Sequence, residues 1–142
     1  MTAPRVDFYL LTDADPRARA RVACRLAEKA FSAGQRVHLH CADVAEAETL
    51  DKLLWTFRDK AFVPHGLVGS DEPIEIGHAE PAATAAVLIN LTDEVPGWYA
   101  RFERVAEIVG AADPSKHAGR ARFRFYRDRG CTPTTHDVGA AS

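Results

Sequence analysis

Short apolar runs alternate along this chain with longer stretches of helical periodicity, and this alternation restricts the fold more than any other feature. The strand-like runs are VDFYLL at 6–11, RVHLHC at 36–41, PIEIG at 73–77 and AAVLINL at 85–91. Apolar residues recur every three to four positions over 15–33 and 44–57, as in helices that pack one face on a core. Such alternation predicts an α/β fold with a mostly parallel sheet flanked by helices.

Two further helices are predicted in the C-terminal half. Pro96 opens a third helix that ends at Gly110, with an apolar stripe made of Trp98, Phe102, Val105 and Val109. Asp113 and Pro114 are typical of a helix start, and they predict a fourth helix that ends near Arg129. The remaining residues, CTPTTHDVGAAS, show no periodicity. We therefore expect a single domain over 1–130 and a flexible tail over 131–142.

Length and composition exclude several classes of protein. The 142 residues suffice for one domain, and 46% hydrophobic with 27% charged residues is typical of globular proteins. No apolar run approaches the roughly 20 residues that span a bilayer, and the N-terminus lacks the apolar region of a signal peptide. The three cysteines fit neither a disulfide framework nor a zinc site. We expect a cytoplasmic protein that has reduced thiols and no membrane contact.

Polar residues near the strand ends are candidates for enzyme chemistry. Asp13 and Asp15 follow the first strand, where α/β folds often bind ligands, although Asp15 also suits a helix cap. His65 could transfer protons, but no nucleophile accompanies it in the sequence. Neither GxGxxG nor GxxxxGK[ST] occurs, so the usual phosphate-binding loops are absent from the sequence. We favour structural roles and expect no catalytic residue and no cofactor; a small nucleotide-binding enzyme using these three residues is the alternative.

A histidine pair in the second strand is a possible metal site. His38 and His40 lie two residues apart, so they share one face of the strand, and Asp43 could complete a zinc site. No CxxC or HExxH motif supports a metal. We therefore expect packing beneath a helix and no bound metal.

The segment 115–130 is strongly basic, although the whole chain has a net charge of −2. A helical wheel based on its apolar residues places the inner face at Ala118, Ala121 and Phe125. Four residues then share the opposite, exposed face: Arg120, Phe123, Arg124 and Arg127. An exposed phenylalanine among guanidinium groups suits a ligand that combines negative charge with an apolar anchor. The alternatives are an ordinary charged face and direct binding of nucleic acid, which the negative balance of the chain disfavours.

Trp55 predicts a second binding surface. The apolar stripe of its helix lies on another side, so Trp55 should point outward, close in sequence to Phe62. Aromatic residues are enriched in the cores of protein interfaces. The alternative is that the loop 62–69 folds back over Trp55.

Short motifs spread over nearly the whole chain resemble the chi subunit family of bacterial DNA polymerase III holoenzyme. They are FYLL at 8–11, LDKLLWTF at 50–57, FVPHGLVG at 62–69, PIEI at 73–76, VLINL at 87–91 and GRARFRFYRDRG at 119–130. The resemblance implies a Rossmann-like fold without nucleotide chemistry.

The resemblance also implies a function. Proteins of this family form a heterodimer with the psi subunit, which links them to the clamp-loader complex, and they bind the acidic C-terminal tail of single-stranded DNA-binding protein. That tail ends in a phenylalanine with a free carboxylate. By position, Arg120, Phe123, Arg124 and Arg127 match the tail site, and Trp55 and Phe62 match the psi surface. The implied protein is a non-catalytic replication subunit whose contact with DNA is mainly indirect.

Overall fold

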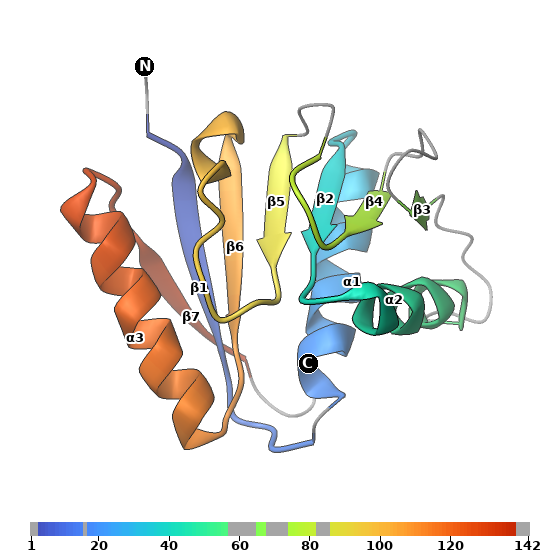
Figure 1. The fold of residues 1–142 in the computed structure, drawn as a ribbon, viewed down its shortest axis with the longest axis horizontal. Helices are drawn as coiled ribbons and strands as arrows, with labels where there is room; N and C mark the ends of the chain where they lie inside the picture. The colour runs from blue at the N-terminus through green and yellow to red at the C-terminus, as the bar shows by residue number, and fades with distance from the viewer. Residues whose placement is uncertain (1–2, 16, 57–64, 68–73, 82–85, 139–142) are drawn as a thin grey trace.

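The computed structural model describes residues 3–15, 17–56, 65–67, 74–81 and 86–138 and contains a seven-stranded sheet (Figure 1). Along the sheet the strands follow the order β3-β4-β2-β5-β6-β1-β7, and every described pair is parallel. The strands are β1 (Arg5–Leu11), β2 (Val37–His40), β3 (His65–Leu67), β4 (Ile74–Gly77), β5 (Val87–Asn90), β6 (Arg104–Val109) and β7 (Thr134–Val138). The predicted single-domain α/β fold with a parallel sheet is confirmed.

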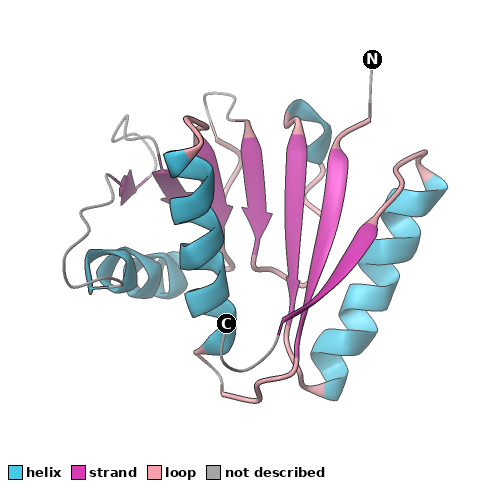
Figure 2. Cartoon of the chain, turned by 180° about the vertical axis from the view of Figure 1, so that it is seen from behind, coloured by secondary structure: helices cyan, strands magenta, loops and turns pink. Residues whose placement is uncertain are grey.

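Helices cover both faces of this sheet and create two cores. The helices are α1 (Ala18–Ser32), α2 (Val44–Thr56), the 3₁₀ turn η1 (Tyr99–Arg101) and α3 (Asp113–Asp128). Seen from behind, α1 lies in front of the sheet and α3 lies beyond it (Figure 2). The core beneath α1 and α2 includes Leu39, Ile76 and Ile89, and the core beneath α3 includes Phe8, Leu88 and Val105. The middle of the sheet is buried on both faces because β1, β5 and β6 each contribute apolar residues to both sides.

The third helix predicted over 96–110 is wrong. The chain instead forms η1 and then β6, which pairs with β5 on one side and β1 on the other. Val105 and Val109 face the core under α3, whereas Ala106 and Ile108 face the core under α1. Residues four apart share a face in a strand as well as in a helix, so the valine spacing is compatible with both. Residues on both faces of this segment are buried, and the segment therefore forms a strand.

The expectation of an unstructured tail is wrong for the described part of 131–142. After α3 the chain turns at Gly130, whose φ is +88°, and Cys131 is buried. Thr134–Val138 then forms β7, an edge strand parallel to β1 with Thr135 opposite Phe8. The partner strand lies more than 120 residues away in sequence, so no local pattern in the tail reveals the pairing. Residues 139–142 lie outside the described part.

The proposed cap at the start of α1 is also wrong. The helix begins at Ala18, with Arg17 in the capping position and no side-chain cap bond. Asp15 instead accepts hydrogen bonds from the backbone N–H and the guanidinium of Arg17, at 2.9 and 3.2 Å. These bonds lower the pKa of the Asp15 carboxyl to about 2. Asp15 therefore stabilises the turn before the helix and not the helix end itself.

His38 and His40 pack against the aromatic side chain of Trp98, which follows β5. The ring centroids of Trp98 lie 5.6 Å from His38 and 4.9 Å from His40. His38 is fully buried, and its Nδ1 lies 3.1 Å from Glu75 Oε1. Within the described residues, no three His, Cys, Asp or Glu side chains are grouped as metal ligands would be. The cover over the two rings is the segment around η1 and not an α-helix.

Burial of these two histidines predicts a loss of stability in mild acid. Burial lowers the pKa of both His38 and His40 from 6.5 to about 4. Below pH 6.5 the unfolded chain therefore binds protons that the folded state excludes. The free energy of unfolding should fall by about 1.4 kcal/mol per pH unit for each histidine, with no such loss above pH 6.5. Urea unfolding at pH 7.5, 6.5, 5.75 and 5 measures this slope.

Two matched variants test whether the packed histidine rings cause this dependence of the unfolding free energy on pH. His40→Gln should reduce it, whereas His117→Gln, at an exposed position on α3, should leave it unchanged. Equal slopes in wild type and His40→Gln would contradict the assignment.

Candidate functional site

The basic helix α3 packs on the sheet with a different face from the one that its apolar residues indicate. Gly119, Arg122 and Tyr126 are buried, and Ala121 is exposed. Arg122 points inward because its Nε lies 2.8 Å from Oε1 of the buried Glu107 in β6. The inner face proposed from Ala118, Ala121 and Phe125 is therefore wrong, since it takes no account of a buried arginine.

This rotation gives Phe123 a different environment from the predicted one. Its side chain is half-buried, and its ring centroid lies 5.4 Å from that of Phe8 in β1. Phe123 thus belongs to the edge of the core under α3 and is not an aromatic ring standing in solvent. One side of this half-buried ring faces a pocket.

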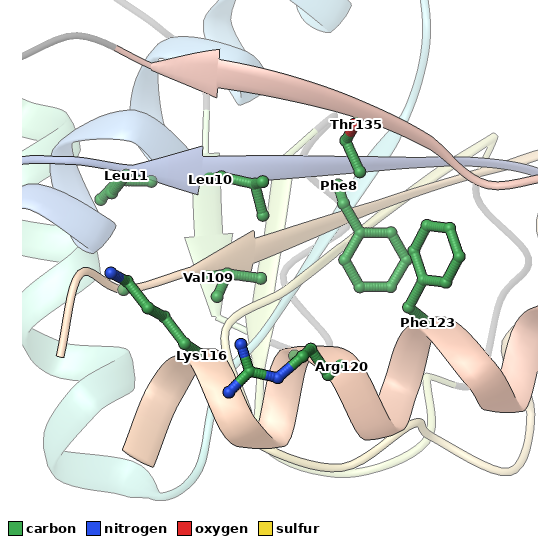
Figure 3. Close-up of a pocket in the computed structure, with 10 residues that line it drawn as sticks. Phe8, Leu10, Leu11, Val109, Lys116, Arg120, Phe123 and Thr135 are labelled. Carbon is green, nitrogen blue, oxygen red and sulfur yellow. The ribbon is translucent and has the colours of Figure 1, made fainter. Parts of the chain in front are cut away.

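The pocket lies between α3 and the strands β6, β1 and β7 and has a volume of about 230 Å³ (Figure 3). Its lining is largely apolar, and the side chains come from four elements: Phe8, Leu10 and Leu11 of β1, Val109 of β6, Phe123 of α3 and Thr135 of β7. On the helix side, Gly119 and the two cations Lys116 and Arg120, which lie one turn apart on α3, also line the pocket. The result is an apolar recess bordered by two cations.

Neither of these two cations has an ion-pair partner among the described residues. Lys116 and Arg120 are both exposed. Arg127 follows on the same flank of the helix, and its Nε lies 3.6 Å from the exposed carboxylate of Asp128. Arg124 is exposed but does not line the pocket. Of the four residues predicted for the site, the structure places Arg120 and Phe123 at the pocket and leaves Arg124 and Arg127 on the surface around it.

Several residues of the pocket are absent from the sequence-based prediction. Lys116 lies four residues before Arg120, so helical spacing alone could have found it. Phe8 and Val109 are found only once β1 and β6 are known to be neighbours, and Thr135 only once β7 is known to exist.

The second predicted surface lies at the other end of the sheet. Trp55 belongs to the last turn of α2, which packs beside β3 and β4. The described structure does not include its side chain, and Phe62 lies outside the described residues. Because β3 and β7 are the two edges of the sheet, α2 and the pocket occupy opposite ends of the molecule.

The residues proposed for an enzyme site are not brought together. Asp13 and Asp15 follow the carboxyl end of β1 and are engaged locally, Asp13 with the backbone N–H of Asp15 and Asp15 with Arg17. His65 begins β3, and four strands separate β3 from β1. In a parallel sheet, the start of one strand and the end of another also lie at opposite margins. These three residues therefore form no common site.

Comparison of the sequence with known proteins identifies a family and several relatives. The family model described as DNA polymerase III chi subunit, HolC, matches residues 3–134. The DNA polymerase III subunit chi of Pseudomonas aeruginosa is 50% identical over 129 residues, which cover 89% of this chain and 91% of that protein. The subunits chi of Haemophilus influenzae and Escherichia coli are each 31% identical, and the matches cover 96% and 87% of this chain and 99% and 90% of those proteins.

A solved structure shares the fold without close sequence similarity. The crystal structure of T4 UvsW superposes with a TM-score of 0.68 at 9% identity; the match covers 98% of this chain, which spans 42% of that one. No helix within the described part of this chain is long and apolar enough to cross a membrane. The family match covers almost the whole chain, including all seven strands at least in part. This chain therefore belongs to the family of DNA polymerase III chi subunits, accessory subunits of a replicative polymerase assembly.

Proposed function

We propose that this protein is a non-catalytic adaptor of the replisome. In this role it binds the acidic C-terminal tail of single-stranded DNA-binding protein at the pocket beside α3, and it binds the psi subunit, and through it the clamp-loader complex, near Trp55 and Phe62. The observation that carries the proposal is the apolar pocket bordered by Lys116 and Arg120.

The pocket matches a terminal phenylalanine in size and chemistry. An apolar cavity of about 150 Å³ accommodates benzene, so a pocket of 230 Å³ has room for one phenyl ring. Phe8 and Phe123 offer ring surfaces with which an incoming ring can pair edge-to-face or offset. In this arrangement the terminal carboxylate accepts charge-assisted hydrogen bonds from Arg120 or Lys116. Acidic residues upstream then lie near Arg127 and Arg124.

The placement of the two surfaces supports an adaptor. The tail pocket uses β1 and β7, and α2 lies beside β3 at the far edge of the sheet. Two partners can therefore bind at once without competing for the same side chains. The protein itself contacts DNA mainly indirectly in this proposal, through the partner that binds the single strand. Such a subunit works in the cytoplasm, where the replisome works.

Titration of a labelled tail peptide, with and without its last phenylalanine, tests the proposal at two salt concentrations. The intact peptide should bind, and the truncated peptide should bind poorly even at low salt because it loses the apolar anchor. Raising the salt should weaken the contribution of the exposed cations, since the Debye length falls from about 10 Å at 0.1 M to about 3 Å at 1 M. Equal affinity for the two peptides would reduce the site to a charge patch and overturn the proposal.

A further inference from the structure

We propose that Arg122 is a positioning residue for the tail pocket: its buried ion pair with Glu107 sets the rotation of α3 about its axis and thereby aims Phe123 and Arg120 at the pocket. This inference rests on the proposed tail-binding function. It assigns to one arginine of the basic helix a task different from that of its exposed neighbours.

The ion pair is the centre of a buried hydrogen-bond network beneath α3. Glu107 is fully buried, and its two carboxylate oxygens accept bonds from Arg122 Nε at 2.8 Å and from the Tyr126 hydroxyl at 2.5 Å. Asn90 Nδ2 lies 3.0 Å from both of these oxygens. Burial raises the pKa of the Glu107 carboxyl, and these three donors oppose that shift because they stabilise the charged form. Each donor therefore compensates part of the cost of a buried charge.

The network also ties α3 to the segment that follows β5. Arg122 Nη1 donates to the carbonyl oxygen of Asp93 at 3.2 Å, and Asn90 Nδ2 donates to that of Glu94 at 2.9 Å. Arg122 is thus held at two points, by a side chain of β6 and by the backbone of this segment. Two anchors on one planar guanidinium restrict both its position and its orientation.

Such restraint matters because the pocket wall is made of adjacent residues of the same helix. Arg120 and Phe123 lie two residues before and one residue after Arg122, so any rotation of α3 moves them with it. The helix also lies very close to β6 at Gly119, where an added Cβ would be 2.9 Å from both γ-methyl carbons of Val109. Val109 is itself part of the pocket. A small rotation would therefore change the shape of the recess and the direction of its cation together.

Apolar packing does not account for the burial of Arg122. The apolar residues of α3 favour an inner face at Ala118, Ala121 and Phe125, but the structure buries Arg122 and Tyr126 instead. Replacing a buried ion pair with apolar residues of similar volume is often neutral or stabilising, so the pair is not needed for folding as such. In this proposal the ion pair selects one orientation of α3, and binding of the tail peptide depends on that orientation.

The double variant Glu107→Leu/Arg122→Met separates positioning from stability. We expect it to remain folded but to unfold at a lower urea concentration than wild type, because the buried Tyr126 hydroxyl loses its acceptor on Glu107. Its affinity for the intact tail peptide should fall about tenfold or more, because binding groups must be held within about 0.5 Å. The ratio of affinities for the intact and the Phe-deleted peptide should fall as well, since the misplaced wall no longer recognises the ring. If Arg122 and Glu107 had a purely structural role, a stably folded variant would keep both the affinity for the intact peptide and the ratio of the two affinities.

Control variants complete the test. Arg129→Met removes one exposed arginine at the C-cap of α3, where its guanidinium lies over the ring of Phe125, and should preserve the ratio of the two affinities. If the double variant does not fold, Arg122→Lys decides, because it keeps the positive charge but lacks the planar guanidinium that also reaches the Asp93 carbonyl; it should lower the ratio while the domain remains folded. A folded double variant, or a folded Arg122→Lys variant in that case, with the wild-type ratio would overturn the inference. Failure of wild type to bind the tail peptide would instead overturn the proposed function.

Discussion

We expect the Arg120→Ala variant to bind the acidic tail peptide about 10- to 150-fold more weakly than wild type. A hydrogen bond to a charged group contributes about 1.5–3 kcal/mol, which corresponds to that range of affinity. Arg120 lines the pocket, and within the described residues it has no acidic partner that would compete with the ligand. Its loss should therefore remove a contact to the terminal carboxylate that no other described arginine can replace from the same place.

Arg124→Ala is the matched control for this prediction. Arg124 lies one turn further along the same helix and carries the same charge, but it does not line the pocket. It should cost less affinity, and its effect should disappear at high salt because an exposed contact is screened. Fluorescence titration of both variants at 0.1 M and 1 M salt measures the difference. Equal losses in the two variants at both salt concentrations would show that the arginines act only as a general positive surface.

Replacing Trp55 or Phe62 with alanine should abolish binding of the psi subunit and leave tail binding unchanged. Truncation of a central aromatic anchor commonly costs about 2 kcal/mol or more, which weakens binding about 30-fold. The α2 helix that carries Trp55 packs at the β3 edge, whereas the pocket lies at the β7 edge. Removing a side chain at one edge should therefore not disturb the other.

Calorimetry with purified psi and a tail-peptide titration on the same samples measure both sites. Val44→Ala is a suitable control because it truncates an apolar side chain that is 56% exposed in the first turn of the same helix. It should bind both partners normally. If Trp55→Ala unfolds the domain, Trp55 belongs to the core, and the prediction of an outward side chain is wrong.

The strands show which parts of the fold local sequence patterns can predict. VDFYLL and AAVLINL are apolar over most of their length, RVHLHC alternates apolar and polar residues, and each contains a strand buried on both faces. The helices α1 and α2 follow from their own periodicity in the same way. The prediction failed at β6, where residues four apart fit a helix and a strand equally well, and only the burial of both faces separates the two.

The candidate site shows a different limit. Arg120 and Phe123 are found from the sequence because charge and aromatic character are properties of single residues. The direction of their side chains is not, because it depends on which face of α3 is buried, and that face includes Arg122, whose partner Glu107 lies on a strand distant in sequence. Thr135 is a further example, since it reaches the pocket only through the pairing of β7 with β1.

The sequence alone determined the alternation of strands and helices, the parallel sheet and the helix that carries the basic residues, because these depend on the spacing of apolar and charged residues within a few turns. The tertiary structure alone decided which face of α3 is buried, that residues 134–138 form an edge strand, and that four distant segments enclose one pocket with two cations at its border. These features depend on contacts between residues far apart in the chain. Their free energy comes from burial and from pairing a buried charge, and neither exists until the sheet has brought the partners together.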